Sequence, residues 1–341
     1  MEEKTILDDK LFLKQLNSSP VGSFLFFGEE DYTKNYCLDM ARKAVITDPA
    51  FALFNETVLD GNDLDLDMLK SAVETLPFMA DSRLIVVRPF RPDLLKKEEA
   101  ETLCDILAQA QNSQNLTILA CPNDVSPDDK KNSVFQELSQ YLTPVAFRKS
   151  TPDRLAVWVQ KHFAANNVNA DKSICDALIR RCGTSMYPLS LEIDKISYFV
   201  LASGRTAVAP QDLEEVSTKD ASVGAFDLSN ALLAKKKDDA LRILQNLRFN
   251  KEDPIKVLSM VSSVFCDQLE IRALMEEGMP KSEIAASLKM HEYKTGLYMN
   301  ALRNVSVQDV RNILKICSDA DALIKKGRSG FEALEYLVCA I

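Results

Sequence analysis

The sequence contains only two histidines, and histidine is the residue type most often used for proton transfer or metal binding near neutral pH. His162 and His291 lie on predicted helices in different parts of the chain. A catalytic triad or a zinc site would need other residues to converge on one of them, and no spacing in the sequence indicates such convergence. We therefore expect both to lie at a surface or an interface, with no catalytic residue and no metal site.

An acidic run at residues 60–67, DGNDLDLD, has the composition of a divalent-cation loop. Its carboxylates do not follow the ligand spacing of a calcium-binding hand, and no glutamate closes the loop. The simpler interpretation is that Asp63 or Asp65 caps the helix that follows.

A phosphate-binding loop is the next candidate, because the apolar strand predicted at 23–27 ends at Gly28 and leads into a helix. Such a loop needs several glycines, a lysine and a Ser or Thr, whereas residues 28–34 read GEEDYTK. Three consecutive carboxylates would repel a triphosphate, although they suit the positive end of a helix dipole. We expect acidic helix capping here, and no cofactor.

The strongest binding signal is apolar: Leu76, Pro77, Phe78 and Met79 connect a predicted helix to a predicted strand. Pro77 ends the helix at or before Leu76, because proline lacks an amide donor and restricts its predecessor. Connecting segments favour the surface, so these side chains are a candidate anchor for a hydrophobic pocket on a partner. The alternative is that Phe78 folds back onto the core of its own domain.

Nucleic-acid contacts have weaker support. Residues 282–298 have the outline of a helix-turn-helix, but the second helix carries Tyr293, Lys294, Leu297 and Tyr298 in place of the Arg, Asn or Gln that commonly read bases. Ordinary helix packing is favoured. The basic clusters at 180–181 and 235–237 are explained as solvated helix ends.

The elements that position these residues follow two patterns. Before residue 150, apolar strands alternate with amphipathic helices, which predicts a parallel α/β sheet; the strands are expected at 23–27, 55–59, 83–87, 116–121 and 145–148. From residue 151 the pattern is all helical, with helices at 153–165, 171–182, 188–202 and 210–216, a break at 220–224, and five or six further helices. We predict three domains, at 1–150, 151–221 and 222–341.

Composition limits the class of protein. The 341 residues are 46% hydrophobic and 27% charged, as in globular proteins of two or three domains. A formal charge of −9 is too acidic for a protein that mainly coats nucleic acid. Eight cysteines without a CxxC pair indicate buried thiols in a reducing compartment. Residues 1–4 lack the features of a signal peptide, and no apolar run reaches about 18 residues, so we expect a cytoplasmic protein without membrane contact.

Four further features follow one another along the chain: FGEE at 27–30, LPFM at 76–79 running into SRLIVVR at 82–88, the segment 183–195, and the pattern from 291 to 327. Their order resembles that of the bacterial DNA polymerase III delta subunit family of clamp loaders. None is diagnostic alone, but together they extend over nearly the whole chain.

The resemblance implies a degenerate AAA+-like α/β domain without a working phosphate loop, a small helical lid domain and a helical collar domain that joins a five-subunit ring. It implies that Leu76, Pro77, Phe78 and Met79 bind the sliding clamp (beta) and stabilise its opened ring for loading onto primed DNA. The collar would contact the other loader subunits, tau/gamma and delta-prime. No catalytic activity and no cofactor are implied.

Two departures from the general clamp-binding pattern concern its ends. That pattern opens with Gln and closes with Leu-Phe, whereas here Glu74 takes the first place and Pro77 the penultimate one. Two other classes also stay open: a P-loop-like nucleoside triphosphatase using the loop at Gly28, and a helix-turn-helix DNA-binding regulator using residues 282–300.

Overall fold

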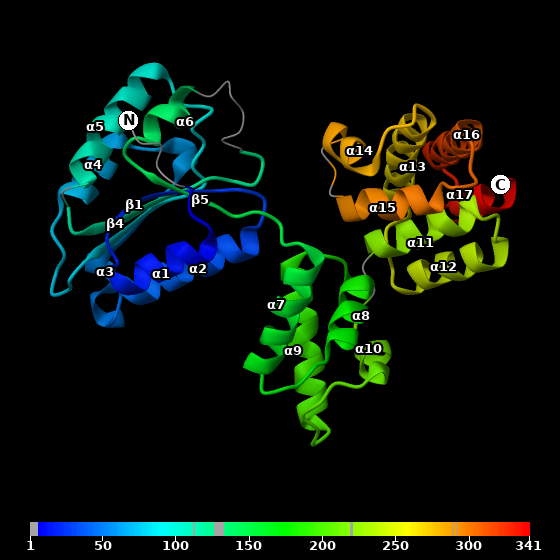
Figure 1. Ribbon diagram of the computed structural model, residues 1–341, viewed down its shortest axis with the longest axis horizontal. Coiled ribbons are helices and arrows are strands. Elements are labelled where there is room, and N and C mark those ends of the chain that lie inside the picture. Colours follow the sequence, from blue (N-terminus) through cyan, green and yellow to red (C-terminus); the bar gives the residue numbers. More distant parts are fainter. Residues whose placement is uncertain (1–5, 112, 126–132, 219–220, 289, 291) are drawn as a thin grey trace. The chain divides into compact units, whose positions relative to one another are not determined.

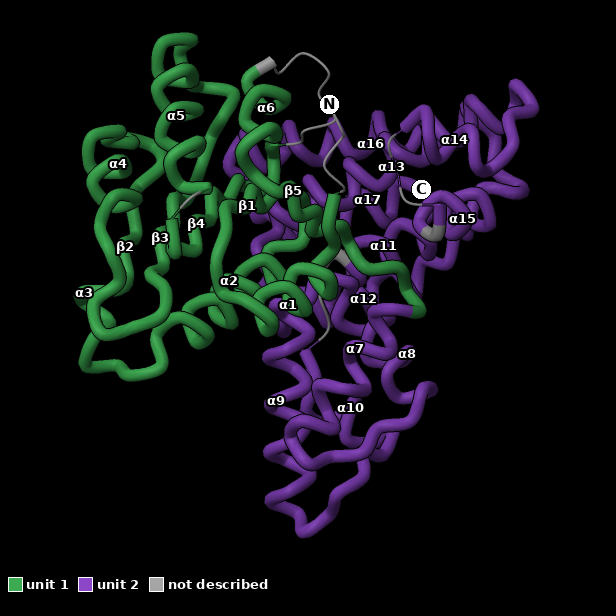
Figure 2. The backbone as a smooth tube through the Cα atoms, turned by 60° about the vertical axis from the view of Figure 1, so that its left-hand side comes forward, with its two compact units in different colours: residues 1–153 green, residues 154–341 purple. Residues whose placement is uncertain are grey.

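The structure is a computed structural model that describes residues 6–341, except residues 112, 126–132, 219–220, 289 and 291. His291 therefore lies outside the described residues. The chain divides into two compact units, residues 1–153 and 154–341 (Figure 2). The further division of the second unit near residue 221 remains a prediction.

The first unit is built on a parallel sheet of five strands in the order β2-β3-β4-β1-β5. The apolar runs form strands because both faces of the sheet are covered, so alternation with polar residues is not needed. The strands are β1 (Gly22–Phe27), β2 (Glu56–Leu59), β3 (Arg83–Val87), β4 (Asn115–Ala120) and β5 (Thr143–Ala146). The last strand lies two residues earlier than predicted.

Helices cover the two faces of this sheet (Figure 1). The helices α1 (Asp9–Ser18) and α2 (Asp31–Val45) pack on one face, and α4 (Leu66–Glu74), α5 (Lys97–Ala110) and α6 (Ser133–Leu138) pack on the other. Within β3, Leu84 and Val86 belong to the first core and Ile85 and Val87 to the second. Two short segments, η1 (Pro49–Phe51) and α3 (Ala52–Asn55), lead directly into β2.

The second unit is helical throughout its described residues, apart from loops and an isolated bridge. Its first helices are α7 (Pro152–Ala165), α8 (Lys172–Cys182), α9 (Met186–Ala202) and α10 (Pro210–Val216), close to the predicted bounds. The helices that follow are α11 (Ala221–Leu233), α12 (Lys237–Phe249), α13 (Pro254–Glu276), α14 (Lys281–Ser287), α15 (Glu292–Ala301), α16 (Val307–Lys325) and α17 (Gly330–Ala340). The described residues thus contain seven helices after α10, where five or six were predicted.

The predicted break at 220–224 is placed too late in the chain, because residues 221–224 are the first turn of α11; residue 220 lies outside the described residues. Gly224 does not interrupt the helix. A Cβ atom on Gly224 would lie 2.9 Å from Cδ2 of Leu247, so glycine permits close packing of α11 against α12. The signal that we interpreted as a chain break is a packing requirement.

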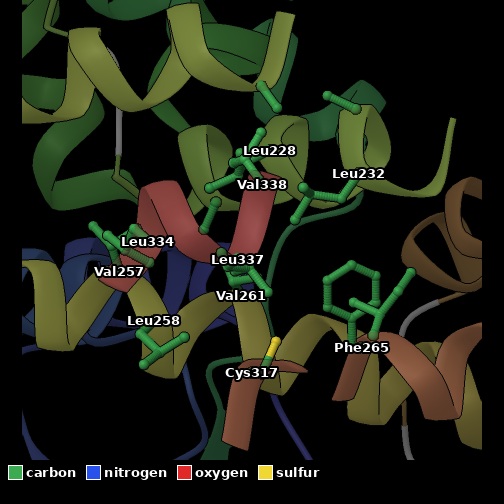
Figure 3. Close-up of a cluster of buried hydrophobic side chains, with 14 of the residues drawn as sticks. Leu228, Leu232, Val257, Leu258, Val261, Phe265, Cys317, Leu334, Leu337 and Val338 are labelled. Atoms are coloured by element: carbon green, nitrogen blue, oxygen red, sulfur yellow. The ribbon is translucent and has the colours of Figure 1, made fainter. Parts of the chain in front are cut away.

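The helices α11–α17 share one core, in which long α13 is central (Figure 3). Val261 and Phe265 of α13 are fully buried between side chains of α11, α16 and α17. The labelled members of this core are Leu228, Leu232, Val257, Leu258, Val261, Phe265, Cys317, Leu334, Leu337 and Val338.

The cysteines are all free thiols, and most are buried as expected. The expectation was wrong for Cys266 and Cys339, which are exposed, and Cys104 is intermediate. An amphipathic helix presents some small residues to solvent, and cysteine type alone does not indicate which face a residue occupies. No described helix is both long and apolar enough to cross a bilayer.

Candidate functional site

The segment from Leu76 to Met79, which we call the apolar tip, follows the end of α4 at Glu74 and precedes β3. Asp65 caps the start of α4, with its Oδ1 accepting from the amides of Asp67 (2.9 Å) and Met68 (3.0 Å). The helix is anchored on the sheet by buried Leu69, Ala72 and Val73, which belong to the core on that face. The packed helix α4 therefore places the apolar tip at the amino end of β3.

The apolar tip is exposed, as the connecting position predicted. Leu76 is 80% exposed, Met79 78% and Phe78 46%, and Pro77 is half-buried. The ring of Phe78 does not enter the core. It leans on two other surface aromatics, with centroids 4.9 Å from Phe54 and 6.0 Å from Phe51.

Sequence reasoning missed the contribution of α3. Leu53 is 91% exposed and Phe54 54% exposed, and both precede β2 just as the apolar tip precedes the adjacent strand β3. The amino ends of neighbouring parallel strands lie at the same edge of a sheet, which explains why the two segments meet. Together Leu53, Phe54, Leu76, Phe78 and Met79 form an exposed apolar surface of the kind that marks interaction sites. The run FALF at 51–54 was the available signal.

The backbone of the apolar tip is held by a buried side chain that we had assigned to a strand. Asn55 ends α3 and is 1% exposed. Its Nδ2 donates to the carbonyl oxygen of Phe78 (2.8 Å), and its Oδ1 accepts from the Phe78 amide (2.7 Å). The exposed aromatic ring of Phe78 thus sits on a fixed backbone.

The phosphate-loop candidate follows the carboxyl end of β1, whereas the apolar tip lies at the amino ends of the strands. The side chain of Lys34 occupies the interior of this loop. Lys34 is buried, and its Nζ donates to the carbonyl oxygens of Gly28 and Cys121, both at 2.9 Å. It also pairs with Oδ1 of Asp31 at 3.1 Å. Three protein oxygens therefore satisfy the ammonium group that a nucleotide-binding loop would direct at phosphate.

Gly28 serves packing at this position. Its φ is +116°, and a Cβ atom there would lie 2.3 Å from the carbonyl oxygen of Phe147. That oxygen accepts a hydrogen bond from the amide of Glu30 (3.1 Å). Burial raises the pKa of the Glu30 carboxyl above its ordinary value, because a carboxylate withdrawn from water loses part of its hydration. The expected acidic capping is present, since the Glu30 side chain accepts from the amide of Tyr32.

Replacing Lys34 with methionine is expected to destabilise the first unit by about 3 kcal/mol, because the buried carbonyls of Gly28 and Cys121 lose a charged donor. Urea unfolding followed by circular dichroism measures the loss. Lys14→Met on the exposed side of α1 is the matched control and should change stability by less than about 0.5 kcal/mol. Equal stability of the two variants would show that Lys34 is not a structural donor.

The acidic run and the described histidine have structural roles. Oδ1 of Asp60 accepts from the amide of Asn62, and Asp65 caps α4, as one of the two predicted alternatives. Within the described residues no cluster of His, Cys, Asp and Glu is suited to a metal ion. Nε2 of His162 lies 3.3 Å from Oδ1 of Asp194, and its ring packs near Trp158 on α7.

The helix-turn-helix candidate corresponds to α14 and α15; Tyr298 of α15 faces the protein interior, whereas the Lys294 side chain is half-exposed. Tyr298 is 3% exposed and stacks on Phe226, and Lys294 donates to Oδ2 of Asp267 on α13 (2.8 Å). These contacts support the favoured interpretation of helix packing; Leu297 is partly exposed, and the side chain of Tyr293 lies outside the described residues.

The basic clusters also make contacts within the protein. Nη1 of Arg181 pairs with Glu214 at 3.2 Å, and its guanidinium donates to the carbonyl oxygen of Ser217. Nζ of Lys237 donates to the carbonyl oxygen of Cys339 at 2.9 Å. Arg181 at the end of α8 is thus held by protein partners and is not the solvated helix end that we expected, and Lys237 is the first residue of α12.

Comparison with known proteins identifies relatives of the whole chain. The DNA polymerase III subunit delta of Bacillus subtilis (strain 168) is 24% identical over 332 residues, which cover 94% of this chain and 92% of the relative. The probable DNA polymerase III subunit delta of Aquifex aeolicus is 21% identical over 310 residues, covering 89% and 85%. The solved structure of the Bacillus subtilis DNA clamp loader delta protein matches with a TM-score of 0.70 at 22% identity, covering 97% of this chain and 98% of that chain.

The structural likeness confirms the predicted fold class at the level of a parallel α/β sheet domain followed by an all-helical part. Family models then specify the protein class. The model described as DNA polymerase III, delta subunit, matches residues 24–147, and the model for the C-terminal domain of the same family matches residues 223–340. The chain belongs to the DNA polymerase III delta subunit family.

Proposed function

We propose that this chain binds the sliding clamp (beta) through the apolar tip and stabilises the opened clamp for loading onto primed DNA during replication. Family membership supports the general role, and one observation supports the site: Leu76, Phe78 and Met79 are exposed on a backbone held by buried Asn55. Pro77, half-buried between them, restricts the chain that carries these side chains. Leu53 and Phe54 extend the same surface.

The proposed mechanism is mechanical. Burying Leu76 and Phe78 in a pocket of the clamp contributes about 1.5–3 kcal/mol per side chain. Binding shifts the clamp toward the open ring only if this chain binds the open ring more tightly than the closed one. The rest of the first unit would supply that difference by pressing on the clamp beside the pocket.

We further propose that the chain has no catalytic role of its own. The protein oxygens around Lys34 and the packing of Gly28 against Phe147 support this proposal, because both use the groups that would otherwise bind a nucleotide. ATP hydrolysis by the neighbouring tau/gamma subunits would control access to the apolar tip. A cytoplasmic location agrees with eight free cysteines.

The proposed collar consists of helices α11–α17, and we propose that it contacts tau/gamma and delta-prime. Phe249 at the end of α12 is 86% exposed, and Ile255 at the start of α13 is 57% exposed. Apolar residues exposed in this way near one helix connection support an interface between subunits.

The test of the proposed function is a titration of the dye-labelled sliding clamp from the same organism with the full chain, in the absence of nucleotide. We expect a saturable rise in fluorescence anisotropy, because the apolar tip is exposed in the free chain. A parallel equilibrium dialysis with labelled ATP should show no binding to the chain alone. Absence of a clamp complex at high micromolar concentration, or tight ATP binding, would contradict the proposal.

A further inference from the structure

The apolar tip is bounded by two asparagines, one on each side, and both are 1% exposed. Asn55 binds both backbone polar groups of Phe78, as described above. Asn115, the first residue of β4, donates from Nδ2 to the carbonyl oxygen of Val73 at 2.8 Å and approaches that of Thr75 at 3.5 Å. Asn115 therefore fixes the backbone before Leu76 and Pro77, and Asn55 fixes the backbone after them.

These hydrogen bonds satisfy backbone amides and carbonyls of the segment that have no partner within a helix or a strand. The last carbonyls of a helix have no amide donor within the helix, and a glycine cap or water commonly satisfies them. Here the side-chain amide of Asn115 satisfies the carbonyl oxygen of Val73 at the end of α4. Thr75 already has an extended backbone, with φ −74° and ψ 128°. Asn55 binds Phe78 as a neighbouring strand would, accepting from its amide and donating to its carbonyl.

The conformation that results is not one that the segment would adopt by default. Met79 has a φ of +48°, in the left-handed region that favours glycine, and its side chain is 78% exposed. A backbone held in a less populated conformation persists when the surroundings determine it, and such positions cluster at binding sites. The two hydrogen bonds between buried Asn55 and Phe78, the residue before Met79, contribute to that determination, and those of Asn115 act earlier, at Val73 and Thr75.

We propose that Asn55 and Asn115 are positioning residues that hold the apolar tip in its docking conformation before the partner arrives. This inference rests on the proposed function, because its consequence is a higher affinity for the clamp. A preformed segment loses less conformational freedom on binding than a flexible one, so affinity is gained without any new contact. Neither asparagine needs to touch the clamp, since both are covered within the first unit.

The experiment compares the full chain with Asn55→Ala, Asn55→Asp and Asn115→Ala in the clamp titration. Asn55→Ala removes both bonds to Phe78 and is expected to weaken clamp binding about 10- to 100-fold. Asn55→Asp keeps an acceptor for the Phe78 amide but faces the Phe78 carbonyl with a second oxygen, so it should weaken binding as well. Asn17→Ala on the exposed side of α1 is the matched control and should leave affinity unchanged.

Hydrogen exchange followed by mass spectrometry separates positioning from general damage to the fold. In Asn55→Ala, peptides containing the Phe78 amide should exchange faster, whereas peptides from β1 and β3 should keep their protection. If Asn55→Ala does not fold, hydrogen exchange of the wild-type chain and clamp binding by Asn115→Ala still test the proposal. A Phe78 amide that exchanges at the random-coil rate in the wild-type chain would overturn the proposal.

Phe78→Ala, measured in parallel, distinguishes failure of this inference from failure of the proposed function. If Phe78→Ala weakens clamp binding while Asn55→Ala and Asn115→Ala bind as tightly as wild type, positioning is wrong and the site is right. If Phe78→Ala binds as tightly as wild type, the proposed docking site itself is wrong.

Discussion

The double variant Leu76→Ala, Phe78→Ala is expected to bind the sliding clamp at least about 100-fold more weakly than the wild-type chain. Each side chain is expected to contribute about 1.5–3 kcal/mol when buried, so losing both costs about 3–6 kcal/mol of binding free energy. The fold should be unaffected, because Leu76 is 80% exposed and Phe78 rests on other surface residues rather than in a core. The anisotropy titration measures the loss, and circular dichroism checks the fold.

The matched control for this prediction is Leu94→Ala. Leu94 is also on the first unit and is 69% exposed, but it lies outside the apolar surface defined above. Its replacement should leave clamp affinity unchanged. Phe54→Ala should have an intermediate effect, because it removes both exposed apolar area and the ring against which Phe78 packs. Unaltered affinity in the double variant would refute the assignment of the site.

Gly28→Ala is expected to destabilise the first unit by about 3–5 kcal/mol. The added Cβ atom would lie 2.3 Å from the carbonyl oxygen of Phe147, and the backbone at φ +116° is unfavourable for any other residue. The neighbouring atom is backbone and cannot turn aside as a flexible side chain can. Urea unfolding of the full chain and hydrogen exchange of β1 and β5 amides measure the effect.

Gly204→Ala provides the comparison that isolates packing from backbone strain. Gly204 also has a positive φ, +70°, but nothing lies within 4 Å of the position its Cβ would take. The substitution should therefore cost only about 1–2 kcal/mol, the usual penalty for a left-handed residue with a side chain. If Gly28→Ala were as mild as Gly204→Ala, the view that Gly28 serves close packing would be wrong.

The strands were predictable from the sequence because a sheet covered on both faces requires continuous apolar runs. The predicted strand at 83–87 has the observed bounds, and Pro77 correctly predicted that α4 ends before Leu76. The short helix α3 was not predictable in this way, because four residues are too few to show helical periodicity. Asn55 was consequently assigned to a strand, and its role in holding Phe78 could not be seen.

The missed parts of the candidate site depend on contacts between distant residues. Leu53 and Phe54 join the apolar surface only because β2 and β3 are neighbours in the sheet. Lys34 is the one lysine in the phosphate-loop candidate at 28–34, but its turn toward the carbonyl of Cys121 joins residues 87 positions apart. Spacing along the chain does not indicate which distant residue a side chain contacts.

The most direct test of the central claim is the distance between two dyes placed on either side of one interface of the sliding clamp. Energy transfer between them reports whether the ring is closed or open. We predict that saturating amounts of the wild-type chain lower the transfer efficiency, and that the Leu76→Ala, Phe78→Ala variant at the same concentration leaves it unchanged. A ring that stays closed with the wild-type chain bound, or that opens equally with the variant, would contradict the account.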